Sequence, residues 1–155
     1  MGHEKDRDAD PGRPASASAR HAQVPDPGQP AAALQILIVE DEMLLAMVLE
    51  EMVAKVGHTT RRVARLSEAM ELVRSEPFAA AVLDVNVAGE PVFPLAVLLR
   101  ECGIPFCFAT GYGVAGLASE FSDCAVLQKP FGAAELLGCV QRLSTSSRPQ
   151  DGRAA

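Results

Sequence analysis

The chain has 155 residues, of which 48% are hydrophobic and 22% are charged, and it contains no tryptophan. This length fits one domain with a single sizeable core. No apolar run approaches the roughly 20 residues that a membrane-spanning helix needs. Residues 1–30 contain no hydrophobic segment that would act as a secretory signal, so we expect a cytoplasmic protein.

Negative charge is concentrated in the middle of the chain. The formal net charge is −6, and residues 34–143 contain eight basic and fourteen acidic residues, which gives −6 for this segment alone. An acidic body argues against unassisted binding of nucleic acid and suits a site that binds a cation. The four cysteines have no zinc-binding spacing, so we expect reduced thiols.

The two ends of the chain differ from its middle. Residues 1–33 contain five of the eleven prolines and eight alanines, with no apolar periodicity. Such a segment cannot bury enough apolar surface to offset the entropy lost on ordering. We therefore predict a disordered N-terminal tail at 1–33, a folded domain at 34–143 and a disordered C-terminal tail at 144–155.

Apolar runs of strand length alternate with helical patterns along the folded domain. Residues 111–116 are glycine-rich, so any helix before Cys124 should be short or loosely held. The segment from Ser67 to Glu76 is predicted to be a helix that begins at a serine cap. The predicted strands are 34–39, 58–63, 78–84, 104–109 and 125–128. The predicted helices are 43–56, 67–76, 91–102 and 133–143.

Strands that alternate with helices give a parallel sheet with right-handed crossovers. The strand at 58–63 is polar, which favours an edge position, whereas the strands at 34–39, 78–84 and 104–109 are apolar and favour the centre. The sequence thus predicts an α/β fold, a flavodoxin-like (βα)5 three-layer sandwich with the parallel strand order 2-1-3-4-5.

Polar side chains follow four of the five predicted strands. Glu40 and Asp41 follow the first, Asp84 ends the third, Thr110 follows the fourth and Lys129 follows the fifth. In an open α/β sheet these ends converge on one face. Neighbouring carboxylates repel unless a cation neutralises them, and hard oxygen ligands suit Mg²⁺. A nearby hydroxyl and ammonium would hold phosphoryl oxygens, so Asp84 is predicted to be a nucleophile that becomes an acyl phosphate.

Each of these residues also has an ordinary structural interpretation. Glu40 and Asp41 fit a solvated loop at a helix start, and Asp84 fits a turn cap. Thr110 fits a turn, and Lys129 fits a surface ion pair of little energetic weight. Agreement at four separate strand ends favours a joint site over four independent coincidences.

Four blocks at these strand ends resemble the signature of the receiver domain of two-component response regulators. The blocks are Val39-Glu-Asp-Glu42, Leu83-Asp-Val-Asn86, Ala109-Thr-Gly111 and Gln128-Lys-Pro-Phe131. The resemblance covers roughly residues 34–143. It implies a signalling phosphoprotein that takes its phosphoryl group from the phosphohistidine of a histidine kinase or a histidine phosphotransfer protein.

The resemblance also implies a role for each site residue. Glu40, Asp41, Asp84 and the backbone carbonyl of Asn86 would hold Mg²⁺, and Asp84 would be the phosphoacceptor. Thr110 is similar in position to the switch hydroxyl. Lys129 is similar in position to the lysine that contacts the phosphoryl group.

One position departs from the usual family pattern. Val126 stands three residues before Lys129, where receivers commonly have a tyrosine or phenylalanine that moves on activation. The segment 105–113, with the sequence Pro-Phe-Cys-Phe-Ala-Thr-Gly-Tyr-Gly, resembles the FATGUY subgroup, whose members lack that aromatic and commonly occur as single domains. We expect a stand-alone regulator in a phosphorelay whose switch involves Thr110 and the 111–116 loop.

Candidate partner contacts lie on the first predicted helix and after Lys129. Met43 and Met47 fall on the polar side of the first predicted helix, where they are either core or part of a docking patch for a kinase, continued by Pro130 and Phe131. We expect an unidentified downstream protein partner, no nucleic acid and no membrane. We also expect no external substrate, because the chain would catalyse only its own phosphorylation and dephosphorylation.

Two other functions remain open from the sequence. One is a phosphorylation-independent pseudo-receiver that serves as an interaction module. The other is an aspartyl-phosphate phosphatase or phosphotransferase, which needs a second acid two residues after the nucleophile, where this chain has Asn86.

Overall fold

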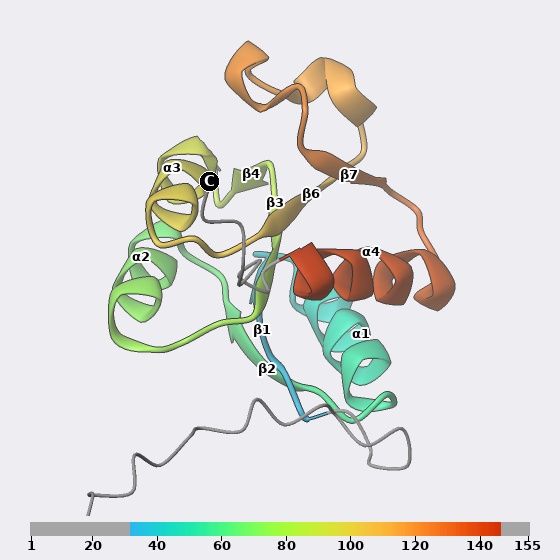
Figure 1. Ribbon diagram of the computed structural model, residues 1–155. Helices are drawn as coiled ribbons and strands as arrows, with labels where there is room; N and C mark the ends of the chain where they lie inside the picture. Colours follow the sequence, from blue (N-terminus) through green and yellow to red (C-terminus); the bar gives the residue numbers. More distant parts are fainter. Residues whose placement is uncertain (1–31, 147–155) are drawn as a thin grey trace, which may run out of the picture. The chain divides into compact units, whose positions relative to one another are not determined.

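A five-stranded parallel sheet forms the middle layer of the computed structural model, which describes residues 32–146 (Figure 1). The strand order is β2-β1-β3-β6-β7, and every neighbouring pair is parallel. This is the predicted order 2-1-3-4-5, so the flavodoxin-like fold class is confirmed, with the polar strand β2 at an edge. The strands are β1 (Gln35–Val39), β2 (Thr59–Val63), β3 (Ala80–Asp84), β6 (Phe106–Thr110) and β7 (Ala125–Gln128).

Two pairs of helices cover the two faces of this sheet (Figure 1). Successive side chains of a strand point to opposite faces, so Ile36 and Ile38 pack under one pair and Leu37 and Val39 under the other. The first pair is α1 (Met43–Ala54) and α4 (Ala133–Ser146). The second pair is α2 (Leu66–Ser75) and α3 (Phe93–Glu101).

A small antiparallel hairpin follows β3 and was not predicted. Its strands are β4 (Asn86–Val87) and β5 (Glu90–Pro91), and they are joined by Ala88 and Gly89, whose φ angles are 51° and 85°. A turn with two positive φ angles usually carries Asn or Asp before Gly, and alanine at this position gave no signal. The predicted helix at 91–102 therefore begins later, at Phe93.

The connection between β6 and β7 contains no α-helix in the part of the chain that the structure describes. It contains two short 3-10 helices, η1 (Gly113–Gly116) and η2 (Ser119–Phe121), as the glycine-rich sequence predicts. Phe121 is fully buried and stacks on Phe93, with ring centroids 5.4 Å apart, and meets Phe108 edge-on at 5.7 Å. The buried ring takes the place of a helix in covering this part of the sheet.

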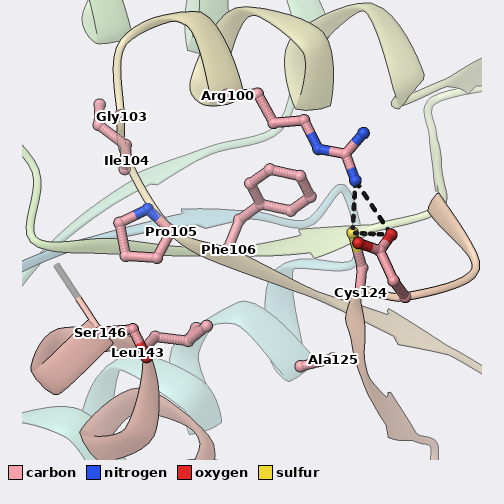
Figure 2. Close-up of a pocket in the computed structure, with 10 residues that line it drawn as sticks. Arg100, Gly103, Ile104, Pro105, Phe106, Cys124, Ala125, Leu143 and Ser146 are labelled. Atoms are coloured by element: carbon pink, nitrogen blue, oxygen red, sulfur yellow. Dashed lines mark hydrogen bonds and ion pairs between the residues drawn. The ribbon is translucent and has the colours of Figure 1, made fainter. Parts of the chain in front are cut away.

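Arg100 of α3 fastens the end of this connection. Its guanidinium carbon lies 4.5 Å from the centroid of the Phe121 ring. Its nitrogens donate to the carbonyl of Glu120 at 3.2 Å, to Asp123 Oδ1 at 3.3 Å and to Cys124 Sγ at 3.3 Å. Figure 2 shows the contact with Cys124 at the rim of a pocket of about 370 Å³. This pocket lies where β6 and β7 begin, whereas the predicted site lies where the strands end.

Several element ends differ from the prediction. Helix α1 ends at Ala54 rather than at 56, and α2 begins at Leu66 with Arg65 at its N-cap, so Ser67 does not cap it. Helix α4 continues to Ser146, past the predicted domain boundary at 143. The predicted disordered tails lie outside the described residues except for 32–33 and 144–146. No helix among the described residues is long and apolar enough to span a membrane.

Candidate functional site

Three carboxylates meet where β1 and β3 end. Glu40 and Asp41 directly follow β1, Asp84 is the last residue of β3, and one oxygen from each lies within 4.8 Å of the others. The two strands are hydrogen-bonded neighbours with Val39 beside Leu83, so their ends lie side by side. The parallel topology therefore brings together acids that are more than forty positions apart in the chain.

Lys129, which directly follows β7, joins this cluster. Its ammonium nitrogen lies 2.9 Å from Glu40 Oε2 and 3.5 Å from Asp84 Oδ2. Burial lowers the pKa of Lys129, but the hydrogen bond to Glu40 and the negative charges of Asp84 and Glu40 outweigh it, so the net pKa is raised. The lysine is thus held as a cation between two carboxylates.

Glu40 is the most buried of the three acids, with 3% of its surface exposed. Burial raises the pKa of its carboxyl group, while the hydrogen bonds from Lys129 and from the backbone of Glu42 oppose that rise. One of its oxygens accepts the Glu42 N–H at 3.0 Å and the other accepts Lys129. Each Glu40 oxygen thus accepts one hydrogen bond, and the pairing of Glu40 with Lys129 was not predicted from the sequence.

Asp41 and Asp84 are the more open acids. Asp41 is exposed and accepts the Ala88 N–H of the hairpin at 3.0 Å, and Asp84 is partly exposed. The N–H of Asn86 donates to Asp84 Oδ1 at 3.4 Å, so Asn86 borders the site. The contact of its carbonyl with a metal stays a prediction.

The donor set fits a hard divalent cation. Three carboxylate oxygens lie close together, and two of the three acids are open to solvent, which leaves room for the waters that Mg²⁺ retains. Only one ammonium group, that of Lys129, pairs with the cluster among the described residues. A cation that joins the acids would therefore relieve repulsion that Lys129 neutralises only in part.

Thr110 lies at the end of β6, between Asp84 and Lys129 in the sheet. In the strand register Asp84 pairs with Ala109 and Thr110 pairs with Gln128, and the N–H of Lys129 donates to the Thr110 carbonyl at 2.9 Å. The Thr110 hydroxyl is buried and accepts the N–H of Tyr112 at 3.0 Å. The hydroxyl therefore fastens the start of the glycine-rich loop.

Val126 is half-buried on β7 opposite Phe108. The side chain that would swing in receivers with an aromatic at this position is absent here. Instead, Gly116 approaches the threonine: a Cβ built on this glycine would lie 3.7 Å from Thr110 Oγ1. The loop that follows Thr110 thus covers the hydroxyl directly.

The predicted docking residues lie on the outside of α1. Met43 is 67% exposed and Met47 is 51% exposed, and Leu44 and Val48, which sequence reasoning missed, extend the patch with 73% and 44%. Helix α1 is apolar on nearly every side, so periodicity alone does not separate its core face from its exposed face.

The other two predicted docking residues follow Lys129. Pro130 is exposed, and Phe131 is half-buried against the core under α1 and α4. Their partner role stays a prediction.

Comparisons with known proteins agree with this fold and site. No protein-family model matches the chain. The phyllosphere-induced regulator PhyR of Methylorubrum extorquens is 34% identical over 115 residues, which are 71% of this chain and 43% of PhyR. The chain spans less than half of the length of the curated relatives that it matches.

Two solved structures extend the comparison. The solution structure of SdrG from Sphingomonas melonis Fr1 is 40% identical with a TM-score of 0.62, and it covers 72% of this chain and 98% of SdrG. The receiver domain of the sensor histidine kinase PA1611 from Pseudomonas aeruginosa PAO1 is 22% identical with a TM-score of 0.62, covering 74% and 99%. That receiver holds a magnesium ion in its active-site cleft.

The fold and the acid cluster thus define a receiver domain of the kind used in two-component systems. The chain belongs to the response-regulator receiver family. Its cluster of Glu40, Asp41 and Asp84 could hold a metal ion.

Proposed function

We propose that this chain accepts a phosphoryl group on Asp84 from the phosphohistidine of a histidine kinase or histidine phosphotransfer protein, with Mg²⁺ bound beside it. The observation that carries the proposal is the position of Lys129, 3.5 Å from Asp84 Oδ2 and 2.9 Å from Glu40 Oε2, next to three converging carboxylates. An acceptor oxygen, a cation for the phosphoryl oxygens and a metal-binding acid pair then share one site.

Each residue of the site would have its own role in phosphoryl transfer. Asp84 attacks phosphorus, the bond between phosphorus and the histidine nitrogen breaks, and its electron pair leaves with the imidazole. Lys129 and the Thr110 hydroxyl donate to the phosphoryl oxygens. Glu40, Asp41, Asp84 and the Asn86 carbonyl would hold Mg²⁺, which would neutralise part of the charge on those oxygens.

The signal would follow from the new charge on Asp84. A phosphoryl group carries a charge of about −1.5 to −2 and offers strong acceptor oxygens. Thr110 would donate to it after a rotation of its side chain that moves Oγ1 away from the N–H of Tyr112, from which Oγ1 now accepts a hydrogen bond. Release of that N–H frees the start of the 111–116 loop, so the loop rearranges and changes the surface that a partner meets.

Partner binding would be the output of the protein. The exposed apolar patch of Met43, Leu44, Met47 and Val48 on α1 borders the site and suits the helices of a phosphodonor. The segment 105–113 supports a FATGUY-type, single-domain regulator. No external substrate is turned over.

Intact mass spectrometry after incubation with acetyl phosphate and Mg²⁺ tests the proposal. We expect one phosphoryl group on the wild type, none on Asp84→Asn and wild-type labelling of the control Asp123→Asn, an exposed acid outside the site. Labelling of Asp84→Asn would move the acceptor elsewhere. No labelling of the folded wild type would make the chain a phosphorylation-independent interaction module.

A further inference from the structure

The hairpin formed by β4 and β5 contacts the acid cluster at two points. At its start, the N–H of Asn86 donates to Asp84 Oδ1 at 3.4 Å. In its turn, the N–H of Ala88 donates to Asp41 Oδ2 at 3.0 Å. The two acids belong to the ends of different strands, since Asp84 ends β3 and Asp41 follows β1. One short element therefore contacts both carboxylates through its backbone.

The hairpin is fixed to the core. Val87 of β4 and Val92, which follows β5, are both fully buried among the side chains under α2 and α3. The N–H of Val92 donates to the Val85 carbonyl at 2.9 Å and closes the base of the hairpin. Val87 pairs with Glu90 in the antiparallel register, so the turn between them is tight. Core packing on both sides of the turn therefore sets the position of its N–H groups.

Ala88 has a backbone conformation that alanine rarely adopts. Its φ angle is 51°, in the left-handed region that favours glycine and asparagine. A residue in this region costs free energy, and it persists where the surrounding structure holds it, often at a functional site. The hydrogen bond to Asp41 is one contact that this conformation makes possible.

Asp41 is held in place by this contact. Its side chain is exposed, and among the described residues the Ala88 N–H is its one hydrogen-bond partner. An exposed carboxylate without a partner would exchange between rotamers, and a ligand that is already oriented loses less entropy when it binds. The N–H occupies Oδ2, so the other oxygen of Asp41 stays open for a cation.

We infer that the β4–β5 hairpin positions Asp41 for the metal ion, with the Ala88 N–H as the group that orients its carboxylate beside Asp84. The inference rests on the proposed function, because it concerns the same metal site. Hydrogen-bond partners of metal ligands commonly change metal affinity by about 10–100-fold. Mg²⁺ demands shorter and more regular oxygen contacts than Ca²⁺, so a fixed pair of acids should favour Mg²⁺.

Replacement of Ala88 by lactic acid in the full chain tests the inference most directly. The exchange turns the N–H into an ester oxygen and keeps the methyl side chain. Chemical-shift titrations should show about tenfold weaker binding of Mg²⁺ than in the wild type, and a smaller loss for Ca²⁺. Equal losses for the two ions would make the hairpin a general support of the fold and would overturn the inference.

The same titrations separate the inference from the proposed function. Wild-type Mg²⁺ affinity in the ester variant would overturn the positioning role of Ala88 and leave phosphorylation of Asp84 in place. A folded wild type that binds no Mg²⁺ would overturn the inference together with the metal-dependent step of the proposed function.

Side-chain variants test the same contact through the conformation of the turn. Ala88→Val should weaken Mg²⁺ binding about tenfold, because a β-branched residue strongly disfavours a φ of 51° and should displace the N–H. The conservative variant Ala88→Gly keeps the N–H and adopts this φ readily, so it should retain the affinity. Ala54→Val is the matched control, since Ala54 is an exposed alanine at the end of α1. Equal Mg²⁺ affinity in Ala88→Val and Ala54→Val would contradict the inference.

Discussion

The acid cluster and the connection between β6 and β7 are built in opposite ways. Glu40, Asp84 and Lys129 stand at the ends of regular strands above fully buried side chains, and they contact one another across the sheet. Residues 111–124 contain two short 3-10 helices, and Phe121 is their one buried side chain. The regular part of the fold fixes the charges, and a loosely packed part next to it is free to change shape.

The connection between β6 and β7 is attached to the rest of the domain at its two ends, and the side chains between these attachments are not fully buried. At its start the N–H of Tyr112 donates to the Thr110 hydroxyl, and at its end Arg100 and the aromatic cluster hold Phe121. The Thr110 attachment belongs to the acid cluster as well. We therefore expect a change at Asp84 to act on the start of the connection and to leave the Phe121 end in place.

The largest effect on stability is expected from removal of the Phe121 side chain, which holds the end of the connection. Phe121→Ala leaves a cavity among Phe93, Phe106 and Phe108 and should lower the free energy of unfolding by about 3–5 kcal/mol in urea titrations. The control Tyr112→Ala removes an equally aromatic but exposed side chain and should change stability little. Equal losses in the two variants would show that the aromatic cluster is no anchor.

The next largest effect concerns the fixed charges. Lys129→Met should reduce the initial rate of phosphorylation by acetyl phosphate about 100-fold, because a positioned cation for the phosphoryl oxygens is lost. Lys55→Met is the control, since Lys55 is an exposed lysine paired with Glu51 on α1. A wild-type rate in Lys129→Met would place the chemistry outside this cluster.

A smaller effect is expected at the surface that receives the phosphodonor. Met47→Glu should slow phosphotransfer from the cognate kinase about tenfold. This factor corresponds to the loss of roughly 1.4 kcal/mol of binding free energy at one interface contact. Acetyl phosphate does not use this surface, so its rate should not change. The control Val97→Glu charges an exposed valine on α3, across the sheet. Equal slowing with both donors would argue against docking on α1.

The smallest effect is expected from the removal of Arg100, which holds the end of the connection through polar contacts. Arg100→Gln should lower the free energy of unfolding by about 1 kcal/mol. The effect is small because solvent partly screens the hydrogen bonds of Arg100 and its contact with Phe121. Amide exchange should rise in residues 119–124 and stay constant in 111–116. A rise confined to 111–116 would reverse the assignment of the two ends.

The convergence of these polar groups was predictable because each of them directly follows an apolar run. Glu40, Asp41, Asp84, Thr110 and Lys129 stand at four strand ends that parallel topology brings together. Contacts across the sheet were not predictable, because they depend on side-chain reach. The pair of Lys129 with Glu40 joins residues 89 positions apart.

Each feature that was not predicted from the sequence was missed for a specific structural reason. The hairpin was missed because Ala88 gives no turn signal, although its φ is 51°. Exposure of Leu44 and Val48 was missed because α1 is apolar on both faces. The burial of Cys107 and Cys139 in one core layer could not be predicted without knowing which face of β6 packs on α4. The strand order, in contrast, followed from the polarity of the second strand.

Amide hydrogen exchange of residues 110–123 with and without beryllofluoride and Mg²⁺ tests the division between a fixed site and a responsive connection most directly. We predict that exchange changes in 110–118 of the wild type, stays constant in 119–123, and does not change in Asp84→Asn. Unchanged exchange throughout 110–123, with beryllofluoride shown to be bound by fluorine resonance, would contradict the account.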